Sequence, residues 1–250
     1  MSTFERYKYP FISLVFIALI GAVFRVLPVV DQPVSEQATH SGEEVRIPTA
    51  GGVLLAGTIF IAPDAGMAVV LAHSFVQGQS QTGLHPLAQE LARNGITALA
   101  FDFQGRGLTG GQQQYEQVHT DVKAAIHYLT GLGHERIGSL GVGLGGFGSA
   151  KNGLALSALV TISIPLVVSN RLGVDEADLS LPYPKLFISA DQDFANRLPF
   201  AQYARDLYAM AAEPKQVKIY SGTYHSMDLF QSEHGPELNT LIIDFFTNLP

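Results

Sequence analysis

Apolar positions along this chain occur in two patterns that alternate from about residue 43 onward. Short continuous apolar runs, such as Ala68–Ala72 and Ile137–Val142, are typical of strands buried on both faces of a parallel sheet. Longer segments between them, such as Val118–Leu129, repeat their apolar residues every three or four positions, as an amphipathic helix does. The alternation predicts an α/β fold with a mostly parallel, doubly wound sheet.

The predicted elements begin with a hairpin that pairs Val45–Thr49 with Val53–Ile61 around Ala50-Gly51-Gly52. Further strands are predicted at 68–72, 96–103, 137–142, 158–164, 185–190 and 216–220, and helices at 84–93, 118–129, 144–156, 199–212 and 237–248. About seventeen residues, 165–181, follow the strand at 158–164. No large lid domain fits in that connection, so we expect a rather open site.

The N-terminal segment has a different pattern. Phe11–Phe24 is fourteen residues without a charge, and Arg6 and Lys8 precede it. If Arg25 reaches toward the lipid headgroups, the apolar stretch extends over residues 9–30 and is long enough to span a bilayer, which takes about 20 residues. A cleaved signal peptide is the alternative, although no good small-residue cleavage site follows.

This pattern predicts four parts, with the folded domain outside the cytoplasm because the positive charges precede the apolar segment. They are a cytoplasmic N-terminus at 1–8, a transmembrane anchor at 9–30, a linker at 31–42 and the α/β domain at 43–250. If the N-terminal segment is cleaved instead, the protein is secreted.

Composition and charge exclude several classes of function. The chain of 250 residues has no cysteine, so it has no disulfide, thiol nucleophile or thiolate metal site. A net charge of −7 without a basic run gives no electrostatic basis for binding nucleic acid. The histidines at 40, 85, 119, 127, 134 and 234 lack the spacing of metal ligands, and we expect no metal or other cofactor.

The segment Ile137–Gly146, I-G-S-L-G-V-G-L-G-G, carries most of the chemical information. It predicts a strand, a glycine-rich turn and a helix, which is the setting of the nucleophile elbow G-x-S-x-G. Gly141 and Gly145 are the flanking glycines, and Gly143 stands where the nucleophilic serine is expected. Ser139 lies inside the predicted strand, so its side chain would not project from the turn.

Four more segments, in this order with the glycine turn, resemble the α/β-hydrolase family of esterases, lipases and dienelactone hydrolases. His73-Ser74-Phe75 is similar to the family's His-Gly oxyanion turn, and Phe101–Gly107 is similar to its F-D-x-R-G-x-G loop. Asp191-Gln192-Asp193 is similar to the strand end that carries the triad acid, and Gly222–His225 is similar to the loop that carries the triad histidine. The resemblance covers about residue 43 to the C-terminus and implies the α/β-hydrolase fold without a large lid.

The resemblance also implies roles for individual residues. His225 would be the triad base and Asp193 the acid that orients it, with Asp191 as the second candidate for the acid. The backbone amides of Phe75 and Leu144 would form an oxyanion hole, which does not depend on a serine side chain.

Three functional hypotheses remain from the sequence. In the first, the His225–Asp193 pair acts as a general base in a weak or serine-independent ester or acyl hydrolase. In the second, the protein binds a ligand without catalysis, in the pocket that would hold the acyl group of a substrate in the family. In the third, Ser74 is a displaced nucleophile. Retention of the acid and the histidine favours the first. The expected partners are a small acyl or ester-type molecule and, through the N-terminal helix, a membrane.

Overall fold

The structure, a computed structural model, describes residues 41–63, 65–170 and 172–249, all within one compact unit of the chain. The predicted N-terminus 1–8, the predicted anchor 9–30 and most of the predicted linker 31–42 lie outside the described residues. Among the residues that are described, no helix has the length and apolar character needed to cross a membrane.

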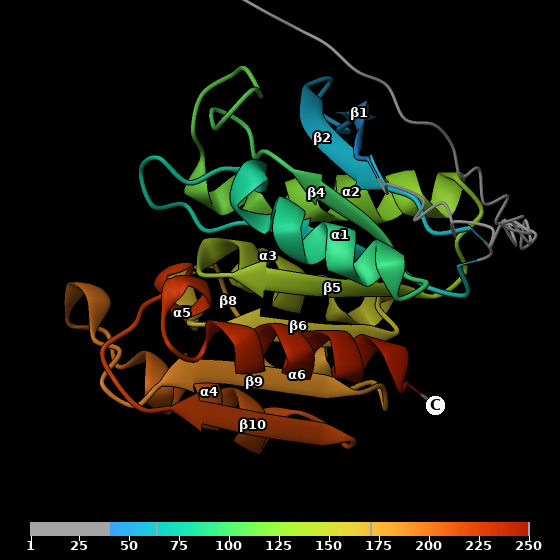
Figure 1. Ribbon diagram of the computed structural model, residues 1–250. Coiled ribbons are helices and arrows are strands. Elements are labelled where there is room, and N and C mark those ends of the chain that lie inside the picture. The colour runs from blue at the N-terminus through green and yellow to red at the C-terminus, as the bar shows by residue number, and fades with distance from the viewer. Residues whose placement is uncertain (1–40, 64, 171, 250) are drawn as a thin grey trace, which may run out of the picture. The chain divides into compact units, whose positions relative to one another are not determined.

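An eight-stranded sheet runs through the centre of the fold, with its strands in the order β1-β2-β4-β3-β5-β6-β9-β10 (Figure 1). The strands are β1 (Glu43–Pro48), β2 (Leu54–Phe60), β3 (Ala68–Ala72), β4 (Thr97–Phe101), β5 (Ile137–Val142), β6 (Ala158–Ile162), β9 (Lys185–Ala190) and β10 (Lys215–Tyr220). The pairs β1–β2 and β2–β4 are antiparallel, and all other pairs are parallel. The predicted N-terminal hairpin and mostly parallel sheet are confirmed.

Helices cover both faces of this sheet (Figure 1). Helices α1 (His85–Arg93) and α6 (Gly235–Thr247) share one apolar core, and α2 (Val118–Gly131), α3 (Leu144–Lys151) and α4 (Phe200–Met210) share the other. Along β3, Val70 and Ala72 belong to one core, whereas Val69 and Leu71 belong to the other. Because the strand is buried on both faces, its sequence is continuously apolar and does not alternate.

Several predicted elements end earlier than the sequence indicated, among them the strand at 158–164, which ends at Ile162, and the helix at 199–212, which ends at Met210. Two others have a visible cause. The strand predicted at 96–103 ends at Phe101, because the Asp102 carboxylate accepts hydrogen bonds from the amides of Gln81 (2.8 Å) and Leu108 (2.9 Å) and so fixes a loop. The helix predicted at 144–156 ends at Lys151, and Gly153 then packs so tightly that a Cβ there would lie 2.0 Å from the carbonyl oxygen of Asp178.

The connection between β6 and β9 contains only small elements. A short hairpin of β7 (Val167–Ser169) and β8 (Leu172–Gly173) is followed by a single 3₁₀ turn at Glu176–Leu179. This hairpin was not predicted, because strands of three and two residues carry no recognisable periodicity. It supplies wall residues to the pocket described below. Elsewhere in the chain, a short helix, α5 (Asp228–Gln231), which was also not predicted, precedes α6.

Candidate active site

The register of the sheet brings three turns together at the carboxyl ends of β3, β5 and β6. Ala72 of β3 pairs with Gly141 of β5, and Val142 pairs with Ile162 of β6. Ser74, Gly143 and Ser163 therefore follow their strands at the same level. In open α/β sheets, ligands bind outside the carboxyl ends of the strands where the strand order reverses, and β3, with β4 and β5 on its two sides, is such a place.

The turn at Gly143 has the strained backbone of a nucleophile elbow although it lacks the serine. Its φ of 55° and ψ of −126° lie where L side chains are rarely found. The flanking glycines are required by packing: a Cβ at Gly145 would lie 2.3 Å from the carbonyl oxygen of Ala72, and one at Gly141 would lie 2.3 Å from the Cα of Gly146. Close packing of the backbone thus maintains the turn without a nucleophile.

The predicted base and acid are joined by a hydrogen bond. His225 Nδ1 lies 2.8 Å from Oδ1 of Asp193, which is fully buried and also accepts a hydrogen bond from the Ser189 hydroxyl (3.3 Å). Because an ionised carboxylate only accepts, Nδ1 carries the proton and Nε2 is left as an acceptor. Asp191 instead is exposed and accepts a hydrogen bond from the amide of Gly222 (2.8 Å). Of the two candidate acids, Asp193 is therefore the one bonded to His225.

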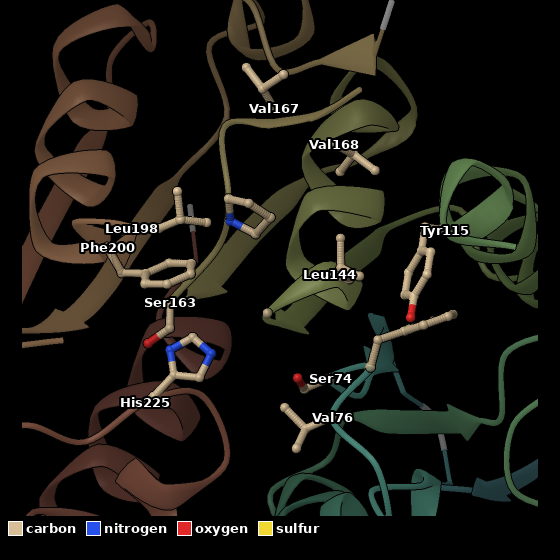
Figure 2. A pocket seen from close by; sticks show the side chains of 13 residues that line it. Ser74, Val76, Tyr115, Leu144, Ser163, Val167, Val168, Leu198, Phe200 and His225 are labelled. Carbon is tan, nitrogen blue, oxygen red and sulfur yellow. The ribbon is translucent and has the colours of Figure 1, made fainter. Parts of the chain in front are cut away.

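A pocket of about 520 Å³ opens between these turns and His225 (Figure 2). Most of its wall is apolar and is contributed by Phe75, Val76, Tyr115, Leu144, Pro165, Val167, Val168, Leu198 and Phe200. None of the described residues that line it has a carboxylate, ammonium or guanidinium group. Its polar side chains are the His225 ring and the hydroxyls of Ser74, Ser163 and Tyr115. Such a wall suits an uncharged, apolar group.

The Ser74 side chain lies next to the position that a side chain at residue 143 would occupy. A Cβ built on Gly143 would lie 2.7 Å from Ser74 Oγ and 3.2 Å from Ser74 Cβ. In Figure 2 the Ser74 hydroxyl lies on the side of the pocket that faces His225. Two hydrogen bonds fix this turn: His73 Nδ1 donates to the carbonyl of Ser74 (2.6 Å), and Arg106 Nη2 donates to the carbonyl of Phe75 (2.6 Å).

The two expected oxyanion-hole residues, Phe75 and Leu144, both line the pocket. Leu144 is the first residue of α3, so its amide has no acceptor within the helix. The amide of Phe75 lies in the turn that His73 and Arg106 fix. Burial lowers the pKa of His73, which keeps its ring neutral and able to donate from Nδ1.

Three residues of the site were missed in the sequence. Phe200 lies against His225, with ring centroids 4.5 Å apart. Ser163 and Ser226 are buried, have positive φ values of 51° and 60°, and have hydroxyls without a hydrogen-bond partner. Backbone strain of this kind is concentrated at functional sites. Two signals were available: Ser163 directly follows a buried strand, and Ser226 directly follows the candidate base.

A strained turn between β5 and α3, an acid after β9 and a histidine after β10, all at the carboxyl edge of one sheet, together define the α/β-hydrolase fold. No protein-family model and no curated protein matches the sequence.

Solved structures do match, and they include esterases and other α/β hydrolases. An esterase of Pyrococcus furiosus has a TM-score of 0.68 and 17% identity over 84% of this chain and 93% of that chain. An esterase domain of a Rhodothermus marinus protein has a TM-score of 0.66 and 17% identity over 84% and 99%. A serine hydrolase without a lid from Xanthomonas campestris has a TM-score of 0.66 and 17% identity over 84% and 96%. At these identities the similarity establishes the fold alone.

Proposed function

We propose that this protein hydrolyses carboxylic esters or related acyl compounds with water as the nucleophile and His225 as the general base. The observation that carries the proposal is the 2.8 Å pairing of His225 with the buried Asp193 beside an elbow turn that has no side chain. A scaffold protein needs no buried carboxylate behind a histidine that faces a pocket. A histidine oriented by a buried carboxylate and open to a pocket on its other nitrogen is the arrangement of a general base.

The chemistry follows from the atoms already placed. Nε2 of His225 takes a proton from water as the water oxygen attacks the acyl carbon, and Asp193 stabilises the charged imidazolium. The amides of Phe75 and Leu144 would stabilise the negative charge on the former carbonyl oxygen. His225 then returns its proton to the leaving alkoxide, and an acid and an alcohol are released. Triad enzymes that lack one member retain about 10³–10⁴-fold acceleration over water, which sets the expected scale.

The substrate class follows from the wall of the pocket. Because the described lining has no fixed charge and is mostly aliphatic or aromatic, it favours an uncharged acyl group with an apolar chain or ring. A volume of about 520 Å³ accommodates a medium-sized acyl group.

A second candidate uses Ser74 as a covalent nucleophile. It is favoured by the Ser74 hydroxyl, which lies within 2.7 Å of the point where the side chain of residue 143 would begin. The two candidates release the same products but differ in one intermediate: only a serine that attacks directly forms an acyl-enzyme.

The test is turnover of a panel of 4-nitrophenyl esters of increasing chain length, followed for the parent chain and for His225→Ala. We expect the substitution to lower kcat by about 10²-fold or more, the usual range for removal of a general base. The matched control is His127→Ala, because His127 is an exposed residue on α2.

The outcomes separate the three hypotheses. Loss of turnover in His225→Ala but not in His127→Ala, together with no fluorophosphonate adduct on the parent chain, supports the general-base mechanism with water as the nucleophile. An adduct on Ser74 after treatment with a fluorophosphonate supports the second candidate. Binding of an ester analogue without turnover by the parent chain would establish a non-catalytic, ligand-binding protein.

We also propose that the segment at 9–30 anchors the domain to a membrane. The support is its length and the absence of charge between Phe11 and Phe24. An anchored chain stays in the pellet after carbonate extraction. Recovery of a soluble chain trimmed before residue 40 would instead indicate a cleaved signal peptide.

A further inference from the structure

Two polar groups face each other across the pocket without a partner. Ser74 Oγ and His225 Nε2 form no hydrogen bond with each other or with any other described residue. Both residues line the pocket, and Figure 2 shows their polar atoms on its two sides. No direct hydrogen bond joins these two atoms, and ordered waters routinely bridge polar groups in active sites.

We propose that Ser74 and His225 together bind the water molecule that attacks the substrate. Ser74 Oγ accepts one of its protons and His225 Nε2 accepts the other. With both protons held, a lone pair of the water oxygen is free to point at the acyl carbon. The proposal rests on the proposed function for its reaction and adds a residue that orients the nucleophile.

Gly143 makes room for this water. In a serine hydrolase the side chain at this position carries the attacking oxygen. Here that side chain is absent, and the hydroxyl of Ser74 lies 2.7 Å from where its Cβ would be. A water bound by Ser74 would thus lie near the position that a serine oxygen at 143 would take.

The turn that carries Ser74 is held more firmly than an ordinary loop. Hydrogen bonds of 2.6 Å from His73 and from Arg106 fix the carbonyls on both sides of the amide of Phe75, and the Arg106 guanidinium lies 5.0 Å from the Phe75 ring centroid. A hydroxyl on a fixed turn can position a water, because the entropy cost of fixing the hydroxyl is met when the protein folds and not during the reaction.

The other nearby hydroxyls are less suited to this role. Ser163 lines the pocket, and the Ser226 hydroxyl lies 3.3 Å from where a Cβ at residue 143 would be, but the hydroxyl oxygens of both residues are buried and have no hydrogen-bond partner. Ser74 is the serine whose hydroxyl lies beside both the vacated position and the pocket.

The reaction step balances without a further reactant. The bond between the water oxygen and the acyl carbon forms while one O–H bond of the water breaks, and that proton moves to His225 Nε2. The second proton stays on the new hydroxyl, which remains hydrogen-bonded to Ser74. Collapse of the intermediate breaks the bond to the leaving oxygen, which takes the proton from His225.

The kinetic test compares Ser74→Ala and Ser74→Thr with the parent chain on 4-nitrophenyl butyrate. Loss of one hydrogen bond to the nucleophile should lower kcat about 10-fold in Ser74→Ala and leave KM within about 2-fold. Ser74→Thr keeps a hydroxyl and should recover most of the rate. Ser180→Ala is the matched control, since its hydroxyl is exposed and bonds the carbonyl of Ala177.

Two further readouts do not depend on a rate. A crystal structure should contain a water within hydrogen-bond distance of Ser74 Oγ and His225 Nε2, and Ser74→Ala should lose it. Intact mass after fluorophosphonate treatment should show no adduct. An adduct on Ser74 would overturn the proposal, because the hydroxyl itself would then attack.

Failure of the inference differs from failure of the proposed function. If the parent chain turns over esters and Ser74→Ala is equally fast, the role of Ser74 is wrong and the function stands. If the water is present and the parent chain has no esterase activity, the function is wrong and the water site stands.

Discussion

The two halves of the candidate site are held in place in different ways. In the half that follows β9 and β10, the side chains are in place: His225 is bonded to a buried Asp193, which is in turn bonded to Ser189. In the half that follows β3 and β5, the backbone is in place but the expected side chain at 143 is absent. The backbone of an elbow can therefore keep its conformation without the side chain that would carry out the chemistry.

The physical reason lies in what holds each half. The elbow is fixed by close contacts of Gly141 and Gly145 with neighbouring backbone atoms, so its shape does not depend on the residue at its tip. The base, in contrast, is held by a hydrogen bond between two side chains, and substitution of either one removes the arrangement. Three experiments, each with its own control, test the two halves.

The largest effect is expected for the acid behind the base. Asp193→Asn should lower ester turnover by about 10²–10⁴-fold, because the amide no longer stabilises the imidazolium or its correct tautomer. Asp191→Asn is the matched control and should stay within about 2-fold, since Asp191 is bonded to the amide of Gly222 and not to the base. Equal losses in the two variants would contradict the assignment of Asp193.

An intermediate effect is expected when a serine is restored at the elbow. Gly143→Ser should acquire labelling by a fluorophosphonate at residue 143 and lose about 1–3 kcal/mol of stability from the strained φ. Its new Cβ would meet Ser74 Oγ at 2.7 Å, so the Ser74 side chain must rotate away. Gly143→Ser combined with Ser74→Gly removes that conflict and should be labelled faster than the single variant.

The control for this experiment is Gly143→Ala, which has the same backbone strain and no hydroxyl. It should be destabilised to a similar extent in urea and should take no label. If Gly143→Ser were more stable than the parent chain, the turn would not have the elbow conformation, and the two halves would not form one site.

The smallest effect concerns His73, which supports the Ser74 turn. Burial lowers its pKa below the ordinary 6.5, so below pH 6.5 the unfolded chain binds a proton that the folded chain excludes. The free energy of unfolding should therefore decrease as the pH falls from 7.5 to 5.5, with up to about 1.4 kcal/mol from this residue. His73→Asn can still donate to the Ser74 carbonyl and does not titrate, so it should flatten the change.

The measurement is urea unfolding of the parent chain and of His73→Asn at both pH values. Burial also lowers the pKa of His85 and His134 and raises that of Asp121, and the difference between variant and parent removes these shared contributions. An unchanged pH dependence in His73→Asn would mean that His73 is not held neutral by the turn.

Much of the fold was predictable because its signals are local. The continuous apolar run at Ala68–Ala72 and the helical repeat in Val118–Leu129 each follow from burial of short segments, and both elements occur where predicted. The glycine turn at 141–145 and the order of Gly143, Asp193 and His225 were likewise readable from sequence motifs.

The sequence by itself determined the type and order of the elements, the glycine at the position where a serine is expected, and the candidate acid and base. Only the tertiary structure decided that Asp193 rather than Asp191 is bonded to His225, and that Ser74 lies beside the vacated position. It also revealed the unpaired hydroxyls of Ser163 and Ser226. These facts depend on strand register and loop packing between segments far apart in the chain, which no local pattern of apolar and polar residues encodes.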